Sequence, residues 1–260
     1  MRTNRIGRLV GVTVGVIACV LSAHTGSARV VQGFESGDPA LTNSTGDHST
    51  QTTFEGQSAP QGSNQYLLTS LIGTADQDGF TDVSGSAAVP NSSLQSFFFN
   101  NLALVGLRGS GVLIPFTVGA GDTSLTFQYD FLSNQPEQSL PKNDFAFEAI
   151  FDSLSNAVVQ GGASGVRFAQ VTGTSFSLFG ASPFIDHTGY QTFSIDISGL
   201  APGNYNLGIG VEALSGGSNQ HDSGVLLDNV QVVPEPNTIA FSIAGASLLV
   251  AFRSRFRKSS

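Results

Sequence analysis

Large apolar and polar side chains alternate strictly in the stretch LTFQYDF, residues 125–131. An alternation with a period of two places one set of side chains on one face of a β-strand and the other set on the opposite face. The same pattern recurs in residues 145–151, 193–197 and 205–211. We therefore predict four half-buried strands, each with one face in a core and the other toward water.

Clusters of glycine and small polar residues separate these strands, as in residues 119–122, 161–162, 201–204 and 215–218. Such clusters mark tight turns, and the body shows no sustained helical period of 3.6 residues. Many short strands separated by such turns predict an all-β fold. We expect a jelly-roll-like β-sandwich, formed as one domain by residues 29–232. Apolar residues are sparse in its first part, where we expect an opening strand near Phe34 followed by long surface loops.

The charge of the chain is concentrated in the body. Residues 30–235 contain all 19 acidic residues but only three of the 11 basic ones, which gives this window a net charge of −16. A nucleic-acid-binding protein needs a basic patch, so this composition excludes nucleic acid as a partner. Charged residues make up only 12% of the chain, which also holds 20 phenylalanines, and this excludes a disordered chain.

Residues 1–28 have the three parts of a secretory signal peptide. Three arginines precede the apolar run Leu9 to Leu21, and small residues follow it. We place the end of the signal at Ala28, so that the mature chain starts at Arg29. Cys19 follows small apolar residues, so lipoprotein processing is an alternative, although the apolar run continues past it. Because Cys19 is the only cysteine, the mature body has no disulfide or thiolate zinc site.

Residues 233–260 form a tail with three consecutive parts. The stretch Val233-Pro234-Glu235-Pro236 is forced into an extended conformation by its two prolines. The uncharged run Ile239 to Phe252 spans about 21 Å as a helix, short of the roughly 30 Å hydrocarbon core. A cluster of basic residues follows it and would stay on the cytoplasmic side of the membrane.

This tail resembles the PEP-CTERM sorting signal, with Pro234, Glu235 and Pro236 as its recognition motif. The resemblance implies a protein that is exported, held in the membrane by its C-terminal helix before processing, and handed to an exosortase-type enzyme. It also implies a final location at the cell surface or outside the cell, in association with exopolysaccharide or a biofilm. A plain C-terminal membrane anchor is the alternative reading of the same residues.

The body resembles the jelly-roll domains of PEP-CTERM proteins, which are similar to galactose-binding-like domains and carbohydrate-binding modules. The matching segments are residues 33–37, 143–147, 188–193, 203–205 and 223–230. The chain departs from sugar-binding platforms in having no tryptophan. Of its four tyrosines, Tyr129 and Tyr205 lie on faces expected in the core. Tyr66 and Tyr190 remain, and we take Tyr190 as the candidate ligand-facing ring.

The resemblance also implies a structural calcium ion between the first and last strands, with Glu35 and Asp228 as its ligands. Asp228 lies among apolar residues of the closing strand, where an unpartnered carboxylate is costly. Calcium binds carboxylate and backbone oxygens. The alternative is that Asp228 faces solvent or caps a local turn. We expect no other cofactor.

Catalytic motifs are missing from the sequence. It has no G-x-S-x-G elbow, no H-E-x-x-H and no P-loop, and we interpret His187 as a turn residue. We therefore expect a protein that is not an enzyme: an exported surface or matrix protein. The alternatives are a lectin similar to a carbohydrate-binding module, or a hydrolase of polysaccharides or peptides that uses a pair of the many carboxylates.

We predict that the mature protein lacks the C-terminal helix, because the tail is cut near Pro234–Pro236. The intact mass of protein recovered from the cell surface measures this, and a mass that still includes residues 253–260 would contradict it. The Glu235→Ala variant should remain in the inner membrane. Normal release of that variant would show that the processing enzyme does not read the glutamate.

Overall fold

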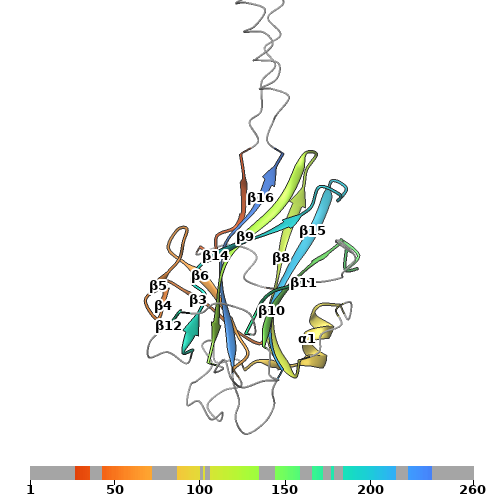
Figure 1. The fold of residues 1–260 in the computed structure, drawn as a ribbon. Coiled ribbons are helices and arrows are strands. Elements are labelled where there is room, and N and C mark those ends of the chain that lie inside the picture. The colour runs from red at the N-terminus through yellow and green to blue at the C-terminus, as the bar shows by residue number, and fades with distance from the viewer. Residues whose placement is uncertain are drawn as a thin grey trace, which may run out of the picture. The chain divides into compact units, whose positions relative to one another are not determined.

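Two antiparallel β-sheets lie face to face in the computed structural model, as Figure 1 shows. The model describes residues 27–35, 43–71, 87–99, 102, 106–134, 144–158, 166–171, 177–178, 184–214 and 222–235. Contacts join Gly26–Glu235 into one unit. The prediction of an all-β, two-sheet sandwich is confirmed for the described residues, to which a short helix, α1 (Asn91–Phe97), is added.

In the first sheet the strands follow the order β12-β13-β9-β16-β6-β3, with β14 also paired to β9 and β1 to β16. The bounds are β1 Arg29–Gln32, β3 Asp47–Gln51, β6 Gln65–Thr69, β9 Asp122–Ser133, β12 Ser177–Leu178, β13 Asp186–His187, β14 Gln191–Asp196 and β16 Ser223–Pro234. The closing strand β16 therefore lies between β9 and β6. The opening strand β1 pairs with the C-terminal half of β16.

In the second sheet the strands follow the order β11-β10-β15-β8-β2, with β7 also paired to β8. The bounds are β2 Ser44–Thr45, β7 Val89–Pro90, β8 Arg108–Val118, β10 Phe145–Phe151, β11 Val166–Gln170 and β15 Gly203–Ala213. A separate hairpin consists of β4 Thr53–Phe54 and β5 Gln57–Ser58. The strands β14 and β11 thus lie at the edges of their sheets in the described part of the chain.

The inner faces of β9 and β15 build the main core, as the alternation predicts. The fully buried side chains of Leu125, Phe127 and Phe131 belong to the same hydrophobic cluster as those of Leu207 and Ile209. Burying an apolar side chain of this size stabilises the fold by about 1.5–3 kcal/mol. The two long strands therefore supply much of the apolar contact between the sheets.

Strand β10 differs from the prediction, because both of its faces are buried. Ala146 and Ile150 face the main core, whereas Phe145, Phe147, Ala149 and Phe151 belong to a second cluster on the outer side of the sheet. Helix α1 covers this second cluster with Leu94 and the following Phe98. The helix has only seven residues, which is too short to show a sustained period in the sequence.

Glycines in β8 and β15 make room for the phenylalanine rings of the second cluster. The ring of Phe98 stacks on that of Phe151, with centroids 6.0 Å apart. A Cβ atom on Gly208 would lie only 2.7 Å from Phe151 and 2.8 Å from Phe98. Gly111 meets the same Phe98 ring from the neighbouring strand. The glycine content of these strands therefore serves close packing as well as turns.

The first part of the body holds more strand than expected. Strand β1 ends before Phe34, which lies in the left-handed region with a φ of 57° and is fully buried against Tyr66, with ring centroids 5.2 Å apart. The long surface loops predicted after it are replaced in part by β3, β6 and the β4–β5 hairpin. β3 is mostly polar because it is an outer strand, paired to β6 alone in the described residues.

A buried ion pair joins the two sheets at one end. Arg108, at the start of β8, is only 7% exposed, and its guanidinium lies 2.6 Å from the Asp222 carboxylate just before β16. The Arg108 Nε–H also donates to the carbonyl of Ser70, which follows β6. Removing one partner of a buried pair leaves an uncompensated charge and costs about 3–5 kcal/mol.

The described residues stop within the predicted sorting motif. Pro234 is the last residue of β16, and the Glu235 N–H donates to the carbonyl of Gly121 at 2.7 Å. Pro236, the predicted signal peptide up to Gly26 and the predicted C-terminal helix lie outside the described residues. Within the described part of the chain, no helix has the length and apolar character that a membrane span requires.

We predict that Gly208→Ala lowers the free energy of unfolding by about 1–3 kcal/mol, because the added methyl group overpacks the Phe98 and Phe151 rings. Urea denaturation measures the change. Gly199→Ala is the matched control, since no heavy atom lies within 4 Å of its new Cβ, and it should alter the stability by no more than about 0.5 kcal/mol. Equal stability of the two variants would contradict the packing described here.

Candidate functional site

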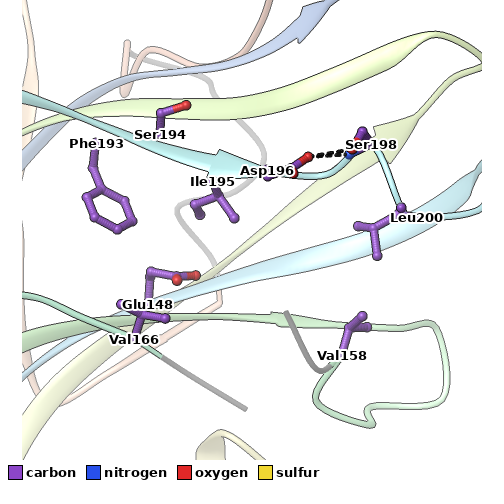
Figure 2. Close-up of a pocket in the computed structure, with 10 residues that line it drawn as sticks. Glu148, Val158, Val166, Phe193, Ser194, Ile195, Asp196, Ser198 and Leu200 are labelled. Carbon is purple, nitrogen blue, oxygen red and sulfur yellow. Dashed lines mark hydrogen bonds between the residues drawn. The ribbon is translucent and has the colours of Figure 1, made fainter. Parts of the chain in front are cut away.

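A cavity of about 560 Å³ opens where β14 of the first sheet approaches β10 and β11 of the second (Figure 2). Because β14 and β11 are edge strands in the described part of the chain, the two sheets leave a groove between them there. The lining residues are Glu148, Val158, Val166, Phe193, Ser194, Ile195, Asp196, Ser198, Gly199 and Leu200.

Glu148 supplies a buried carboxyl group to this cavity. It lies on the inward face of β10, between Ala146 and Ile150, and is only 3% exposed. Its register partners, Val166 and Ile209, are apolar. Burial raises the pKa of Glu148 to about 7, because ionisation is unfavourable in such surroundings.

The sequence analysis missed Glu148, although a signal for it exists. It is the one charged residue in the stretch Phe145–Phe151, where its neighbours predict a strand in contact with the core. Its carboxyl group has no hydrogen bond or ion pair to the described residues. A buried carboxyl group without a partner is costly in its charged form, so water or a ligand in the cavity has to supply the partner of that form.

The rim of the cavity carries a second carboxylate that is well hydrated. The Asp196 Oδ1 accepts hydrogen bonds from the Ser198 Oγ–H at 2.6 Å and the Ser198 N–H at 2.9 Å (Figure 2). The hydroxyl and then the amide of Ser198 lower the pKa of Asp196 below its ordinary value. Asp196 is therefore a charged acceptor at the mouth of the cavity at neutral pH.

Phe193 gives the cavity an aromatic wall. Its ring is half-buried and packs against Phe127 and Phe168, with centroid separations of 5.5 Å and 5.4 Å. Phe168 in turn meets Tyr129 edge to face at 4.8 Å. This group of rings holds Phe193 in place, so that its free side borders the cavity.

Among the described residues, the lining contains no basic side chain. Arg167 lies on β11 beside the lining residue Val166, but its guanidinium carbon is 3.8 Å from the centroid of the Phe145 ring. Phe145 belongs to the outer cluster, so Arg167 is directed away from the cavity. The site therefore combines two carboxyl groups, two serines and a phenyl ring, and it favours neutral or positively charged ligands.

The structure places Tyr190 outside this cavity. Tyr190 is half-buried and packs against the cluster of Phe54, Leu67 and Leu226 on the outer face of the first sheet. Its hydroxyl donates to the side-chain oxygen of Gln65. Burial, together with nearby carboxylates, raises its pKa. The polar end of the ring is thus used within the protein, and a ligand-facing role for Tyr190 stays a prediction.

Glu35 and Asp228 lie near enough to each other for the charge of Glu35 to act on the Asp228 carboxyl group. Glu35 follows β1 instead of lying in it. Asp228 is fully buried and does not face solvent. Burial raises the pKa of Asp228 to about 6, and the negative charge of Glu35 adds to this rise.

Both carboxylates bind the turn formed by residues 61–64. Asp228 accepts the N–H of Gln61 at 2.7 Å, and Glu35 accepts the N–H of Ser63 at 2.7 Å and that of Asn64 at 3.2 Å. Asp228 also accepts the N–H of Asn229 at 2.6 Å, which is the local capping that we considered as an alternative. The two side chains therefore fasten this turn to both ends of the body.

The arrangement does not fit a calcium ion well. Calcium requires six to eight oxygen ligands, whereas these carboxylates already accept amide donors. Across the residues that the structure describes, no group of three or more His, Cys, Asp or Glu side chains is placed to hold a metal ion. Calcium at Glu35 and Asp228 stays a prediction, which melting with calcium and then with chelator, in the protein and in Asp228→Ala, would test.

The interpretation of His187 as a turn residue is wrong. His187 lies in β13, and its Nδ1 is 2.9 Å from Oδ2 of Asp130, whose other oxygen accepts the Thr188 hydroxyl at 3.1 Å. Asp130, which we expected on a water-facing side of its strand, is fully buried. The segment around His187 covers this face of the first sheet, and alternation within one strand cannot reveal such a cover.

Comparisons with known proteins find only distant structural similarities. No protein-family model matches the chain, and no curated protein does. The carbohydrate-binding module TmCBM61, solved with β-1,4-galactotriose, has a TM-score of 0.39 and 11% identity over 78% of this chain and 99% of its own. A structure from a study of carbohydrate-binding modules of the β-sandwich superfamily has a TM-score of 0.42 and 11% identity, over 80% of this chain and 62% of its own.

The enzymatically active domain of tailspike protein 4 of bacteriophage CBA120 has a TM-score of 0.32 and 12% identity, over 74% of this chain and 19% of its own. These similarities are too distant to carry the expected resemblance of the body to carbohydrate-binding modules, which stays a prediction. No comparison bears on the PEP-CTERM resemblance of the tail. Because all three TM-scores are low, we base the function on the side chains of the cavity.

We predict that the protein is more stable at pH 5 than at pH 8. The folded-state pKa values of Glu148 and Asp144 are both raised to about 7 by burial, and that of Asp228 to about 6. In the unfolded chain these carboxyl groups lose their protons at about pH 4. Between about pH 4 and 7 the folded state therefore binds more protons than the unfolded state. Stability is therefore highest at the acidic end of this window and falls as pH rises through it.

Urea midpoints at the two pH values measure this fall. In Glu148→Gln the fall should be smaller, because one of the three groups is removed. Asp196→Asn is the control: its pKa is lowered, so it titrates below this window and the fall should be unchanged. A wild-type midpoint that does not depend on pH, or an undiminished fall in Glu148→Gln, would contradict the prediction.

Proposed function

We propose that the body binds carbohydrate without catalysing a reaction. The observation that carries this proposal is the cavity between β14 and the second sheet, in which a half-buried phenyl ring lies beside carboxyl and serine groups. The hydroxyl groups of a sugar donate hydrogen bonds to such acceptors, and its C–H face packs on an aromatic ring. The volume of about 560 Å³ lies within the range of roughly 300–1,000 Å³ that is common for small-ligand pockets.

The carboxyl groups in the lining indicate which carbohydrates the cavity can bind. Asp196, and Glu148 above its pKa of about 7, repel anionic groups, and none of the described lining residues carries a positive charge. The cavity is therefore suited to a sugar without carboxylate, sulfate or phosphate groups. The proposal does not rest on the matched carbohydrate-binding modules, whose similarity is too distant to carry a ligand.

We further propose that the protein is exported and associated with exopolysaccharide at the cell surface or in a biofilm. The support is the sequence alone: the signal-like residues 1–28 and the PEP-CTERM-like residues 233–260. In this scheme an exosortase-type enzyme releases a membrane-anchored precursor. A body that binds neutral polysaccharide would then hold the released protein in the polymer that surrounds the cell.

A hydrolase is the second candidate, because two carboxyl groups border one cavity. Glycoside hydrolysis needs one carboxyl group that is protonated near neutral pH and another that is ionised. Burial raises the pKa of Glu148 to about 7, while hydrogen bonds from Ser198 lower the pKa of Asp196. Release of reducing sugars from bound polysaccharide, lost in Glu148→Gln, would favour this candidate over simple binding.

We predict that Phe193→Ala weakens binding to polysaccharide about tenfold, because the wall that packs on the sugar is removed. Retardation in native gels that contain neutral polysaccharides measures the affinity. Tyr190→Phe is the control variant, since its hydroxyl bonds to Gln65 outside the cavity, and it should bind normally.

Two results would contradict the proposal. The absence of retardation by every polysaccharide tested would remove carbohydrate binding. Normal retardation of Phe193→Ala together with loss in Tyr190→Phe would move the site to the outer face of the first sheet, where the sequence analysis placed it.

A further inference from the structure

The described lining of the cavity offers its two carboxyl groups no basic partner. Glu148 and Asp196 both line it, and none of the other described lining residues is charged. The surrounding body adds to the negative potential, because residues 30–235 carry a net charge of −16. Arg167, on the adjacent strand, is engaged with the Phe145 ring on the other side of the sheet.

Of the two carboxyl groups, Glu148 has the greater need of a hydrogen-bond donor or a cation, because it is buried. Only 3% of its surface is exposed. It borders the cavity beside Phe193 and Ile195, as Figure 2 shows. Its strand neighbours on both sides, Val166 and Ile209, offer it no polar side chain. Asp196, by contrast, already holds two hydrogen bonds from Ser198. A positively charged donor in the cavity would therefore gain most from Glu148.

The chemistry of the lining favours an organic cation over a metal ion. A hard cation such as calcium requires six to eight oxygen ligands. In the described ranges of the chain, no three His, Cys, Asp or Glu side chains are grouped to hold one. An ammonium group needs only a few acceptors, and charge-assisted hydrogen bonds to a carboxylate are about twice as strong as neutral ones.

We infer that the cavity selects sugars with a free, protonated amino group, that is, non-acetylated hexosamine units, over neutral and N-acetylated ones. The ammonium group pairs with Glu148, the C–H face of the ring packs on Phe193, and Asp196 at the rim adds attraction. Acetylation removes the positive charge, and so removes the pairing with Glu148. This inference rests on the proposed carbohydrate binding and names its ligand class.

The test compares three oligomers of equal length and linkage on the full-length protein at about pH 7, because the pKa of Glu148 is about 7 and a lower pH would keep its carboxyl group protonated. They are a β-1,4-linked glucosamine tetramer, its fully N-acetylated form and the corresponding glucose tetramer. Isothermal titration should show at least about tenfold tighter binding of the glucosamine tetramer than of the other two. Glu148→Gln should abolish this preference while neutral binding remains.

Glu55→Gln is the matched control, because it removes one charge from an exposed turn residue far along the sequence from the cavity strands. It should keep the preference, whereas general attraction to an acidic body would be reduced equally in both variants. Equal binding of all three tetramers would overturn the inference and leave carbohydrate binding intact. Binding of none of them, nor of any polysaccharide in the gels, would overturn both. The three-tetramer comparison on the unmodified protein decides the preference even if Glu148→Gln fails to fold.

Discussion

The buried ion pair between Arg108 and Asp222 is the constraint on which one end of the sandwich depends. The body has a net charge of −16 and few basic residues. Arg108 is one of them and is only 7% exposed. It lies at the start of β8, where it contacts the segment that follows β6 and the segment that precedes β16. Asp144 extends the network by accepting the Ser223 hydroxyl and the Leu214 N–H. These charge-assisted contacts set the positions of strands from both sheets at the same end. Among the described residues no ion pair joins the opposing edges of β14 and β11, where Phe193 packs against Phe168 instead, and the cavity lies beside this contact.

Packing on the outer side of the second sheet connects this frame to the cavity. Helix α1 and the phenylalanines around Phe98 cover β10 on one face while the main core covers the other. A strand that is packed on both faces has little freedom to twist or shift. Glu148 is therefore held on a rigid support, which is what a binding group needs if it is to be placed before its ligand arrives. The glycines that admit the aromatic rings thus contribute to the site without touching it.

Alternation along single strands predicted the sandwich and the main core, because β9 and β15 each have one apolar face that meets the other sheet. Alternation gave the wrong burial for the outer face of a sheet where a further layer of the chain covers that face. Helix α1 is too short to leave a periodic signal, and the covers over Asp130 and over the outer face of β10 are made by segments distant in sequence. The burial of Asp228 was foreseeable from its apolar neighbours, but its amide donors in the turn at residues 61–64 were not. Glu148 was recognisable as the one charged residue of a strand expected in the core, but the edge strands β11 and β14 that form a cavity beside it were not.

The central place of β16 has a mechanical consequence. This strand leads to the C-terminal tail and also carries ladders to β9 and β6 along most of its length, with β1 beside its final residues. Antiparallel ladder bonds run perpendicular to their strands. A pull on the chain beyond Glu235 would therefore act along β16 and load many hydrogen bonds at once in shear, instead of opening them one after another as a zipper. If the body bound a polymer at the edge of the sandwich and were pulled through β16, the hydrogen bonds of the whole first sheet would oppose the tension together.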